Sequence, residues 1–290
     1  MHSKKILVSL LVLLVSLVGC NKPLSQKEGK PTVLVSLAPY AYIVKKIAGD
    51  LVKVETLIPE GANPHIYEAS PQTVQSHQHA ALWIYLGEGF DKKMLQFLKE
   101  TGQEIKTLDL ATGVTLLPGP GQDSCCGHDH KEGHDLHIWM SPQLLKGQAE
   151  KITEALLAIL PHEEAALRLH SSELLDELEL LHGTLSTLLS SKKGEVILVS
   201  HPAFAYFCQE YGLQQLSIEV EGKDPRPQHV AEILEKAKTF ALHTIITEPQ
   251  HSNKGAEAIA ARLGITTHRV DPYTENYVEN LLLLGEIIAR

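Results

Sequence analysis

The sequence predicts an α/β fold of two lobes, each with a mostly parallel four-stranded sheet flanked by helices, joined by one long rigid helix. Apolar runs rich in Val and Ile alternate with longer stretches of helical periodicity, and a long amphipathic stretch divides these runs into two sets. Near-continuous apolar strands separated by helices are typical of parallel sheets covered on both faces. The roughly 260 residues beyond the N-terminal segment exceed the usual size of one domain, which also favours two lobes.

Residues 1–19 have the pattern of a signal peptide. Lys4 and Lys5 precede a run of apolar residues and serine over residues 6–18. A helix that spans a bilayer needs roughly 20 residues, so this shorter run behind a basic start predicts an export signal rather than a membrane anchor. The run ends in Leu-Val-Gly-Cys20, which resembles the lipobox of bacterial lipoproteins and implies that Cys20 carries a lipid. The alternative is a buried apolar segment in which the cysteine is incidental.

The remaining chain divides around the predicted long helix. Residues 20–31 are polar and lack an apolar period, which predicts a tether behind the lipid anchor. We then predict an N-terminal lobe over residues 32–161 with strands at 32–37, 52–58, 81–86 and 104–108, a linking helix over residues 162–191, and a C-terminal lobe over residues 192–290 with strands at 195–199, 214–218, 244–247 and 268–271.

The linking helix is predicted from a regular leucine pattern. Between Leu167 and Leu188, leucines recur at spacings of three, four and seven while charged residues fill the other face. This is the period of an amphipathic helix, and Pro161 stands just before it as a boundary signal. A helix within one lobe would show the same pattern, but a position between two sets of strands favours a rigid connector. A rigid connector would limit how far the lobes can hinge.

Charge and cysteine content narrow the class of protein. The net charge is −9 and no Lys/Arg cluster appears beyond the N-terminal segment, which argues against nucleic acid as a partner. Of the four cysteines, Cys20 is assigned to the lipid, and the adjacent Cys125 and Cys126 are poorly placed to pair because a disulfide between neighbours needs a strained backbone. No disulfide framework is predicted. We expect a monomer.

Residues 118–135 are predicted to form an exposed, mobile loop rich in histidine. Four of the sixteen histidines lie between residues 128 and 137, and the loop opens with Pro-Gly-Pro-Gly. The candidate ligands of an auxiliary metal site in this loop are Cys125, Cys126, His128, His130 and His134. The alternative is a solvated polar loop that binds metal only incidentally.

Three histidines stand in short motifs that follow predicted strands or the loop. His65 lies in Asn-Pro-His-Ile-Tyr-Glu, His137 in Asp-Leu-His-Ile-Trp-Met-Ser-Pro and His201 in Ser-His-Pro-Ala-Phe, while a further strand ends at Asp271. Open parallel sheets bind ligands beyond the carboxyl ends of their strands, so these side chains are expected to meet there. Three imidazoles and one carboxylate suit a tetrahedral zinc ion. Taken singly, each histidine is more often a capped or hydrogen-bonded polar residue than a metal ligand; the joint pattern carries the prediction.

The motifs also resemble those of a known family. They are PEGANPHIYE at residues 59–68, HIWMSP at 137–142, HPAFAYF at 201–207 with YGL at 211–213, and EPQ at 248–250. Together they resemble the metal-binding lipoproteins of zinc and manganese ABC importers, the cluster A-I (cluster 9) solute-binding proteins, over essentially the whole mature chain. The resemblance implies two α/β lobes joined by one long helix with metal between them. It also implies an exported protein, lipid-anchored to a bacterial membrane and facing the periplasm or the cell exterior, that passes metal to the membrane permease of an ABC importer.

By position, the ligands of that family fall on His65, His137, His201 and Asp271. Zinc-binding members tend to have histidine at the third position and manganese-binding members glutamate, so His201 favours Zn2+. A histidine-rich loop before the second ligand is also typical of zinc members. Members with this same ligand set include carriers of other metals, which leaves a Mn2+ or Fe2+ carrier as an alternative.

Several positions near the predicted site depart from the family pattern. Asn63 stands where aspartate is usual, Met140 and Ser141 replace leucine and aspartate, and His251 replaces an aromatic residue. These departures affect the hydrogen bonding around the ligands, which alters metal affinity by roughly 10- to 100-fold. The candidate acceptors for imidazole N–H groups are Glu68 and Glu248; the alternative is that both are solvated surface acids.

Two other classes of function fit parts of the pattern. Three histidines with a water in the fourth position describe a zinc hydrolase or lyase, but Asp271 would close the coordination shell, and the sequence has neither a His-Glu-x-x-His nor a Gly-x-Ser-x-Gly motif. A metal-bearing surface adhesin would use the same fold and anchor. The sequence therefore favours a metal carrier that is not an enzyme.

Overall fold

The computed structural model describes residues 29–68, 70–119, 133–219, 227–240 and 242–290. The predicted signal peptide, Cys20 and most of the tether lie outside the described residues, as do Cys125, Cys126, His128 and His130 of the predicted auxiliary site. The chain divides after Lys30, and the second unit, Pro31–Arg290, is compact. The second unit contains both sheets and the candidate site.

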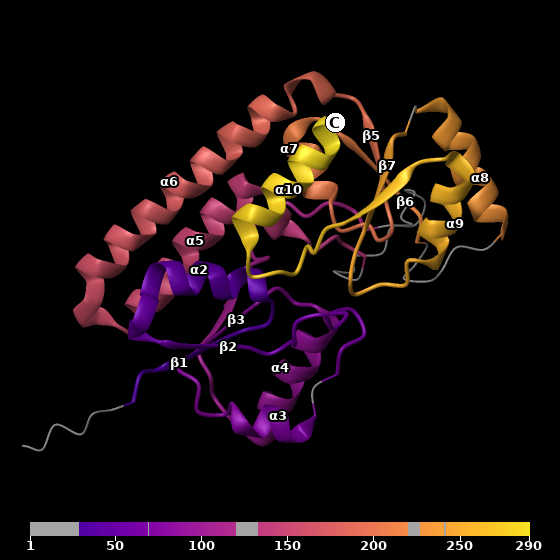
Figure 1. Cartoon of the computed structure of the whole chain (residues 1–290). Helices are drawn as coiled ribbons and strands as arrows, with labels where there is room; N and C mark the ends of the chain where they lie inside the picture. Colours follow the sequence, from indigo (N-terminus) through magenta and orange to yellow (C-terminus); the bar gives the residue numbers. More distant parts are fainter. Residues whose placement is uncertain (1–28, 69, 120–132, 220–226, 241) are drawn as a thin grey trace, which may run out of the picture. The chain divides into compact units, whose positions relative to one another are not determined.

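The first sheet is parallel and has the order β2-β1-β3-β4 (Figure 1). Its strands are β1 (Thr32–Val35), β2 (Lys53–Thr56), β3 (Leu82–Tyr85) and β4 (Thr107–Asp109). The central strands β1 and β3 are the most apolar, and their side chains are buried almost completely because helices cover both faces of the sheet. Helix α2 (Ala38–Ala48) covers one face, and α3 (Pro71–Ser76) and α4 (Gly89–Thr101) cover the other.

The second sheet repeats the same arrangement. Strands β5 (Val196–Val199), β6 (Gln214–Ser217), β7 (Thr244–Thr247) and β8 (Thr266–Arg269) are parallel in the order β6-β5-β7-β8. Its helices are α7 (Ala205–Tyr211), α8 (Pro227–Thr239), α9 (Lys254–Leu263) and α10 (Tyr277–Ala289). The predicted fold class is therefore confirmed. Strand β8 begins two residues before the predicted range, because this edge strand is polar and largely exposed and lacks the apolar run that marks a buried strand.

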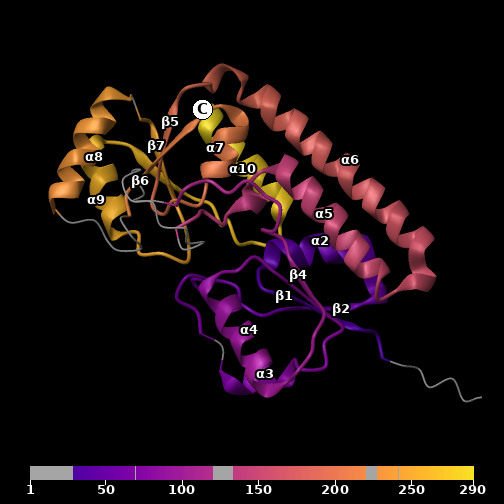
Figure 2. The same cartoon turned by 180° about the vertical axis from the view of Figure 1, so that it is seen from behind.

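Between the two sheets the chain forms α5 (Pro142–Leu157) and the long helix α6 (Glu164–Leu188). Both views show α6 along the outer side of α5 and α10 (Figures 1 and 2). The leucines of the predicted pattern point inward, and those at positions 167, 174, 178, 181 and 185 are buried. Helix α6 thus packs against α2, which lies between β1 and β2, against α5, and against the C-terminal helix α10.

One hydrophobic core runs through both lobes. It joins side chains of the first sheet and α2 with those of α5, α6, α7 and α10 and with Val199 and Val270 at the ends of second-sheet strands. A smaller cluster lies between the second sheet and helices α8 and α9. Since buried apolar area stabilises a fold by roughly 25 cal/mol per Å², separating the lobes along α6 would expose a large part of this shared core at considerable cost.

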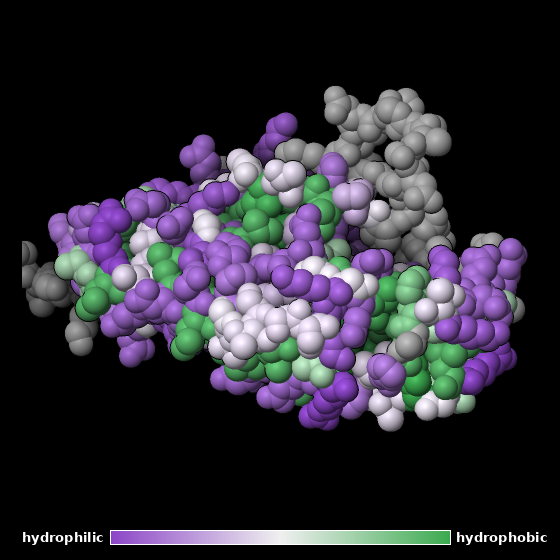
Figure 3. Space-filling view, turned by 90° about the horizontal axis from the view of Figure 1, so that it is seen from above, coloured by the Kyte–Doolittle hydropathy of each residue, from purple (hydrophilic) through white to green (hydrophobic). Residues whose placement is uncertain are grey.

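The face in Figure 3 is largely hydrophilic, with separate hydrophobic patches between polar side chains. The large apolar side chains exposed among the described residues are Ile66, Leu169, Leu180, Phe240 and Leu283. Of the helices in the described part of the chain, none combines the length and the apolar character needed to cross a bilayer.

Two glycines test the packing of α10 on α6. A Cβ atom at Gly285 would lie 2.6 Å from Leu185 Cδ2, whereas a Cβ atom at the exposed Gly183 meets nothing within 4 Å. Gly183→Ala should raise the free energy of unfolding by about 0.5–1 kcal/mol through helix propensity. Gly285→Ala should not raise the free energy of unfolding, because overpacking the buried contact with Leu185 costs about 1–3 kcal/mol and offsets the gain in helix propensity. Urea unfolding of both variants measures the difference; equal stabilisation would contradict a tight α6–α10 contact.

Candidate metal centre

Three imidazole rings converge where the two lobes meet. One ring nitrogen each from His65, His137 and His201 lies within 4.8 Å of the others. The closest pair is His65 Nε2 and His201 Nε2, 3.1 Å apart. His137 stands 5.4 Å from His65 and 5.5 Å from His201 between ring centroids. The structure therefore brings three of the four sequence-predicted ligands together.

The three rings come from different elements. His65 lies in the loop after β2 and His201 directly follows β5, so both stand beyond the carboxyl ends of parallel strands. His137 precedes the short 3-10 helix η2 (Ile138–Met140). Asn63 Oδ1 accepts a hydrogen bond from the backbone N–H of His65 at 2.9 Å, so the amide oxygen fills the acceptor role at this turn that an aspartate would fill.

A carboxylate stands behind each ring on its Nδ1 side. His201 Nδ1 lies 2.5 Å from Glu219 Oε2, and His137 Nδ1 lies 2.7 Å from Asp135 Oδ1. His65 Nδ1 is 3.5 Å from the nearest oxygen of Glu88. A carboxylate at Nδ1 keeps the proton there, and the lone pair of Nε2 is then available to a cation.

Of the two acceptors predicted from sequence, Glu68 lies away from the rings. Glu68 forms an ion pair with Lys93 and its side chain is 71% exposed, so it is a solvated surface acid. The carboxylates that do contact the rings are Glu88, Asp135 and Glu219. A sequence signal existed for Glu88 and Glu219, because each follows the end of a strand, β3 or β6, by two or three residues.

Glu248 follows β7 and is completely buried, with 0% exposure. Neither carboxylate oxygen makes a hydrogen bond of good geometry, and Oε2 lies 4.0 Å from His251 Nε2. The pKa of Glu248 lies well above its usual range. Burial is the main cause, and the charges of Glu219 and Asp271 add to it, whereas the backbone N–H of His201 lowers this pKa. At 4.0 Å, Glu248 does not accept a hydrogen bond from the His251 imidazole, so the acceptor role predicted for it is not seen.

Asp271 stands apart from the three rings. Its Oδ1 accepts hydrogen bonds from Gln250 Nε2 at 2.6 Å and from the backbone N–H of Tyr273 at 2.9 Å, and it does not join the group of ligand atoms around the imidazoles. The hydroxyl of Tyr273 lies between the rings instead, 2.8 Å from His137 Nε2 and 3.2 Å from His65 Nε2. Burial raises the pKa of Tyr273 well above its usual value, so this hydroxyl stays protonated and donates to one of the two nitrogens.

The protonation of the rings differs with their surroundings. Burial, together with the neighbouring histidines, lowers the pKa of His201 to about 3 even though Glu219 opposes the shift. Burial would also lower the pKa of His65, but the hydrogen bond and charge of Glu88 outweigh it and the pKa is raised. At neutral pH the His201 ring is therefore neutral, while the His65 ring takes up a proton more readily than the His201 ring.

Of the predicted auxiliary ligands, only His134 lies among the described residues. It is exposed and forms an isolated antiparallel bridge with Pro118. The auxiliary site stays a prediction.

Comparison with known proteins identifies the family. The profile of the family described as "Zinc-uptake complex component A periplasmic" matches residues 33–285. The chain belongs to this zinc-uptake family. A similar protein of Chlamydia trachomatis, described as a putative metal-binding protein, is 32% identical over 259 residues, which cover 89% of this chain and 90% of that protein. The zinc-binding lipoprotein AdcA of Streptococcus pneumoniae is 30% identical over 280 residues, covering 93% of this chain but 55% of AdcA.

Solved structures of similar proteins share the fold. A crystal structure of ZnuA superposes with a TM-score of 0.82 at 34% identity and covers 90% of this chain and 98% of that one. The periplasmic zinc-binding protein TroA from Treponema pallidum has a TM-score of 0.76 at 20% identity, which bears on the fold alone. The two-lobed architecture predicted from sequence is thus that of the zinc-uptake family.

The different surroundings of His65 and His201 predict an order of protonation. On acidification of the metal-free protein, His65 should take up a proton first, and His201 should remain neutral until about pH 3. NMR titration of the imidazole resonances measures the protonation of both rings. The urea-unfolded chain is the reference, in which each histidine should titrate at about pH 6.5. Protonation of His201 before His65 would contradict the described electrostatics.

Proposed function

We propose that this chain captures a divalent transition metal ion outside the cytoplasm, with Zn2+ preferred, and delivers it to the membrane permease of an ABC importer. The observation that carries the proposal is the convergence of three imidazole nitrogens within 4.8 Å, each ring backed by a carboxylate. Imidazole nitrogen suits zinc and the later first-row metals better than it suits manganese. Membership of the zinc-uptake family supports the importer as partner and favours a carrier over a zinc hydrolase.

The proposed ligands are His65, His137, His201 and Asp271. The histidines need only small movements to meet one ion, because their nitrogens are already close. Asp271 would have to exchange its hydrogen bond with Gln250 for the ion, and the hydroxyl of Tyr273 would have to leave the space between the rings. A four-ligand shell of this kind is closed and suits binding and release rather than activation of water.

The lipid anchor and the auxiliary loop complete the proposal. Lipidation of Cys20 would keep the carrier at the membrane that holds the permease, and a relative of this family is named a lipoprotein. Cys125, Cys126, His128, His130 and His134 would gather metal weakly near the tight site. We propose that the protein acts as a monomer.

Removing any one of the three imidazoles tests the site. His65→Ala, His137→Ala and His201→Ala should each weaken Zn2+ binding by more than the roughly 10- to 100-fold typical of losing an outer hydrogen bond, because a direct ligand is lost. His79→Ala is the matched control, since His79 is exposed and contacts Gln78 rather than the site. Calorimetric titration against a competing chelator gives the affinities, and bound Zn2+ should raise the melting temperature of the wild type. Unchanged affinity in all three variants would refute the assignment.

The choice of metal turns on His201. His201→Glu replaces an imidazole with a carboxylate, which suits manganese better and permits higher coordination. We expect the preference for Zn2+ over Mn2+ to narrow without reversing, because His65 and His137 still favour zinc. Competition titrations of both ions against wild type and variant measure the ratio. An unchanged ratio would mean that this position does not set selectivity.

A further inference from the structure

A second group of ligand atoms adjoins the three-histidine site. One atom each from His201, Glu248 and His251 lies within 4.8 Å of the others. All three residues stand beyond the carboxyl ends of second-sheet strands, His201 after β5 and the other two after β7. The first group, by contrast, takes His65 from the loop after β2 and His137 from the segment before η2.

Two members of this second group, Glu248 and His251, have buried polar atoms without a hydrogen-bond partner of good geometry. Glu248 is 0% exposed, and neither of its oxygens has a hydrogen-bond partner of good geometry; the backbone N–H of His201 acts on it only as a longer-range contact. Nε2 of His251, whose side chain is 6% exposed, also has no partner of good geometry. Unpaired polar atoms in a dry interior are costly and call for an explanation. A cation between them would satisfy both the carboxylate and the imidazole.

The spacing suits a metal ion better than a direct hydrogen bond. His251 Nε2 and Glu248 Oε2 are 4.0 Å apart, which is too long for a hydrogen bond. Two ligands at about 2.0–2.1 Å from a tetrahedral zinc stand roughly 3.3 Å apart, so a closure of less than about 1 Å would place an ion between these atoms.

Glu219 orients the two imidazoles of the group together. Its Oε2 lies 2.5 Å from His201 Nδ1 and 3.3 Å from His251 Nδ1. The two rings are stacked, with centroids 3.9 Å apart and an interplanar angle of 17°. Because both rings turn Nδ1 toward the same carboxylate, both turn Nε2 away from it, toward the neighbouring carboxylate and histidines.

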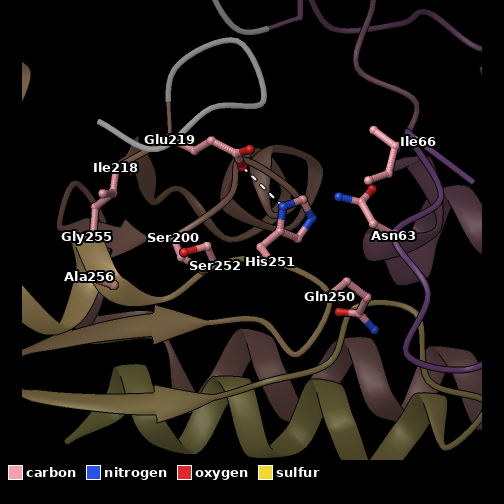
Figure 4. Close-up of a pocket in the computed structure, with 10 residues that line it drawn as sticks. All are labelled: Asn63, Ile66, Ser200, Ile218, Glu219, Gln250, His251, Ser252, Gly255 and Ala256. Carbon is pink, nitrogen blue, oxygen red and sulfur yellow. Dashed lines mark ion pairs between the residues drawn. The ribbon is translucent and has the colours of Figure 1, made fainter. Parts of the chain in front are cut away.

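The second group borders a cavity of about 260 Å³. Figure 4 shows His251 and Glu219, joined by a dashed line, facing Asn63 and Ile66 across this space. Because Asn63 and the exposed Ile66 line this cavity, it lies at the edge of the loop that carries His65. An ion that enters here meets His251 beside His201.

We propose that His201, Glu248 and His251 form a second position for the divalent ion, which adjoins the three-histidine position and shares His201 with it. Because one Nε2 serves one ion at a time, the two positions exclude each other and the protein holds a single ion. The second position belongs wholly to the second lobe, so an ion there stays bound when His65 and its loop move. The inference rests on the proposed function and adds a step to the path of the ion.

The decisive background is the double variant His65→Ala/His137→Ala, which removes the first position and leaves the second. It should still bind one Zn2+ per chain, more weakly than the wild type. Adding His251→Phe or Glu248→Gln should weaken this residual binding by about tenfold or more. His243→Phe is the matched control, because His243 is exposed and precedes β7 while His251 follows it. Calorimetry gives the affinity, and circular dichroism checks the fold.

The outcomes separate the inference from the proposed function. Absence of Zn2+ binding by the wild type would refute the proposed function itself. A wild type that binds, with a double variant that binds no ion or binds one independently of His251 and Glu248, would refute the second position alone. Should the double variant not fold, the comparison is made in His65→Ala, which removes only the more exposed ligand of the first position and keeps the buried His137. There His251→Phe must weaken binding at least tenfold more than His243→Phe, and an equal effect would overturn the proposal.

Discussion

The structure depends on holding three imidazole nitrogens against one another. His65 Nε2 and His201 Nε2 are 3.1 Å apart, and carboxylates behind the rings keep the protons on Nδ1. Two lone pairs at this distance repel each other unless a proton or a cation lies between them, so the arrangement favours a positive charge between the rings. The carboxylates of Glu88, Asp135 and Glu219 further favour a positive charge there, because each adds negative charge behind a ring.

The rest of the fold keeps these rings from moving apart. Trp139 Nε1 donates to the carbonyl oxygen of Pro272 at 2.7 Å, and the hydroxyl of Tyr277 donates to the carbonyl of Trp139 at 2.7 Å. The hydroxyl of Tyr206 donates to the carbonyl of Asp135 at 2.7 Å. The segment that carries His137 is therefore tied to the second lobe at several points. Together with the core shared along α6 and α10, these bonds disfavour a wide hinge motion between the lobes.

Release of an ion from the proposed site would then come from smaller movements. His65 is the natural place, because its side chain is 31% exposed, whereas those of His137 and His201 are 6% and 8% exposed. Its pKa is also raised, so a proton replaces the ion there more readily than at His201. A loop that opens at His65 would leave the ion with the deeper ligands, which suits a carrier that must bind tightly and still deliver.

The sequence by itself determined the fold class, the long helix and the three histidines that meet. These follow from local patterns: the apolar runs of β1, β3, β5 and β7, the leucine period of α6, and histidines placed just after strands. The polar edge strand β8 begins two residues before the range predicted from sequence, because exposed strands carry little apolar pattern. Only the tertiary structure decided which carboxylates stand behind the rings, that Glu68 is a surface acid, that Asp271 turns toward Gln250, and that His251 stacks on His201. Those contacts join residues that are distant in sequence, and their geometry is set by how the ends of separate strands come together, which no local period encodes.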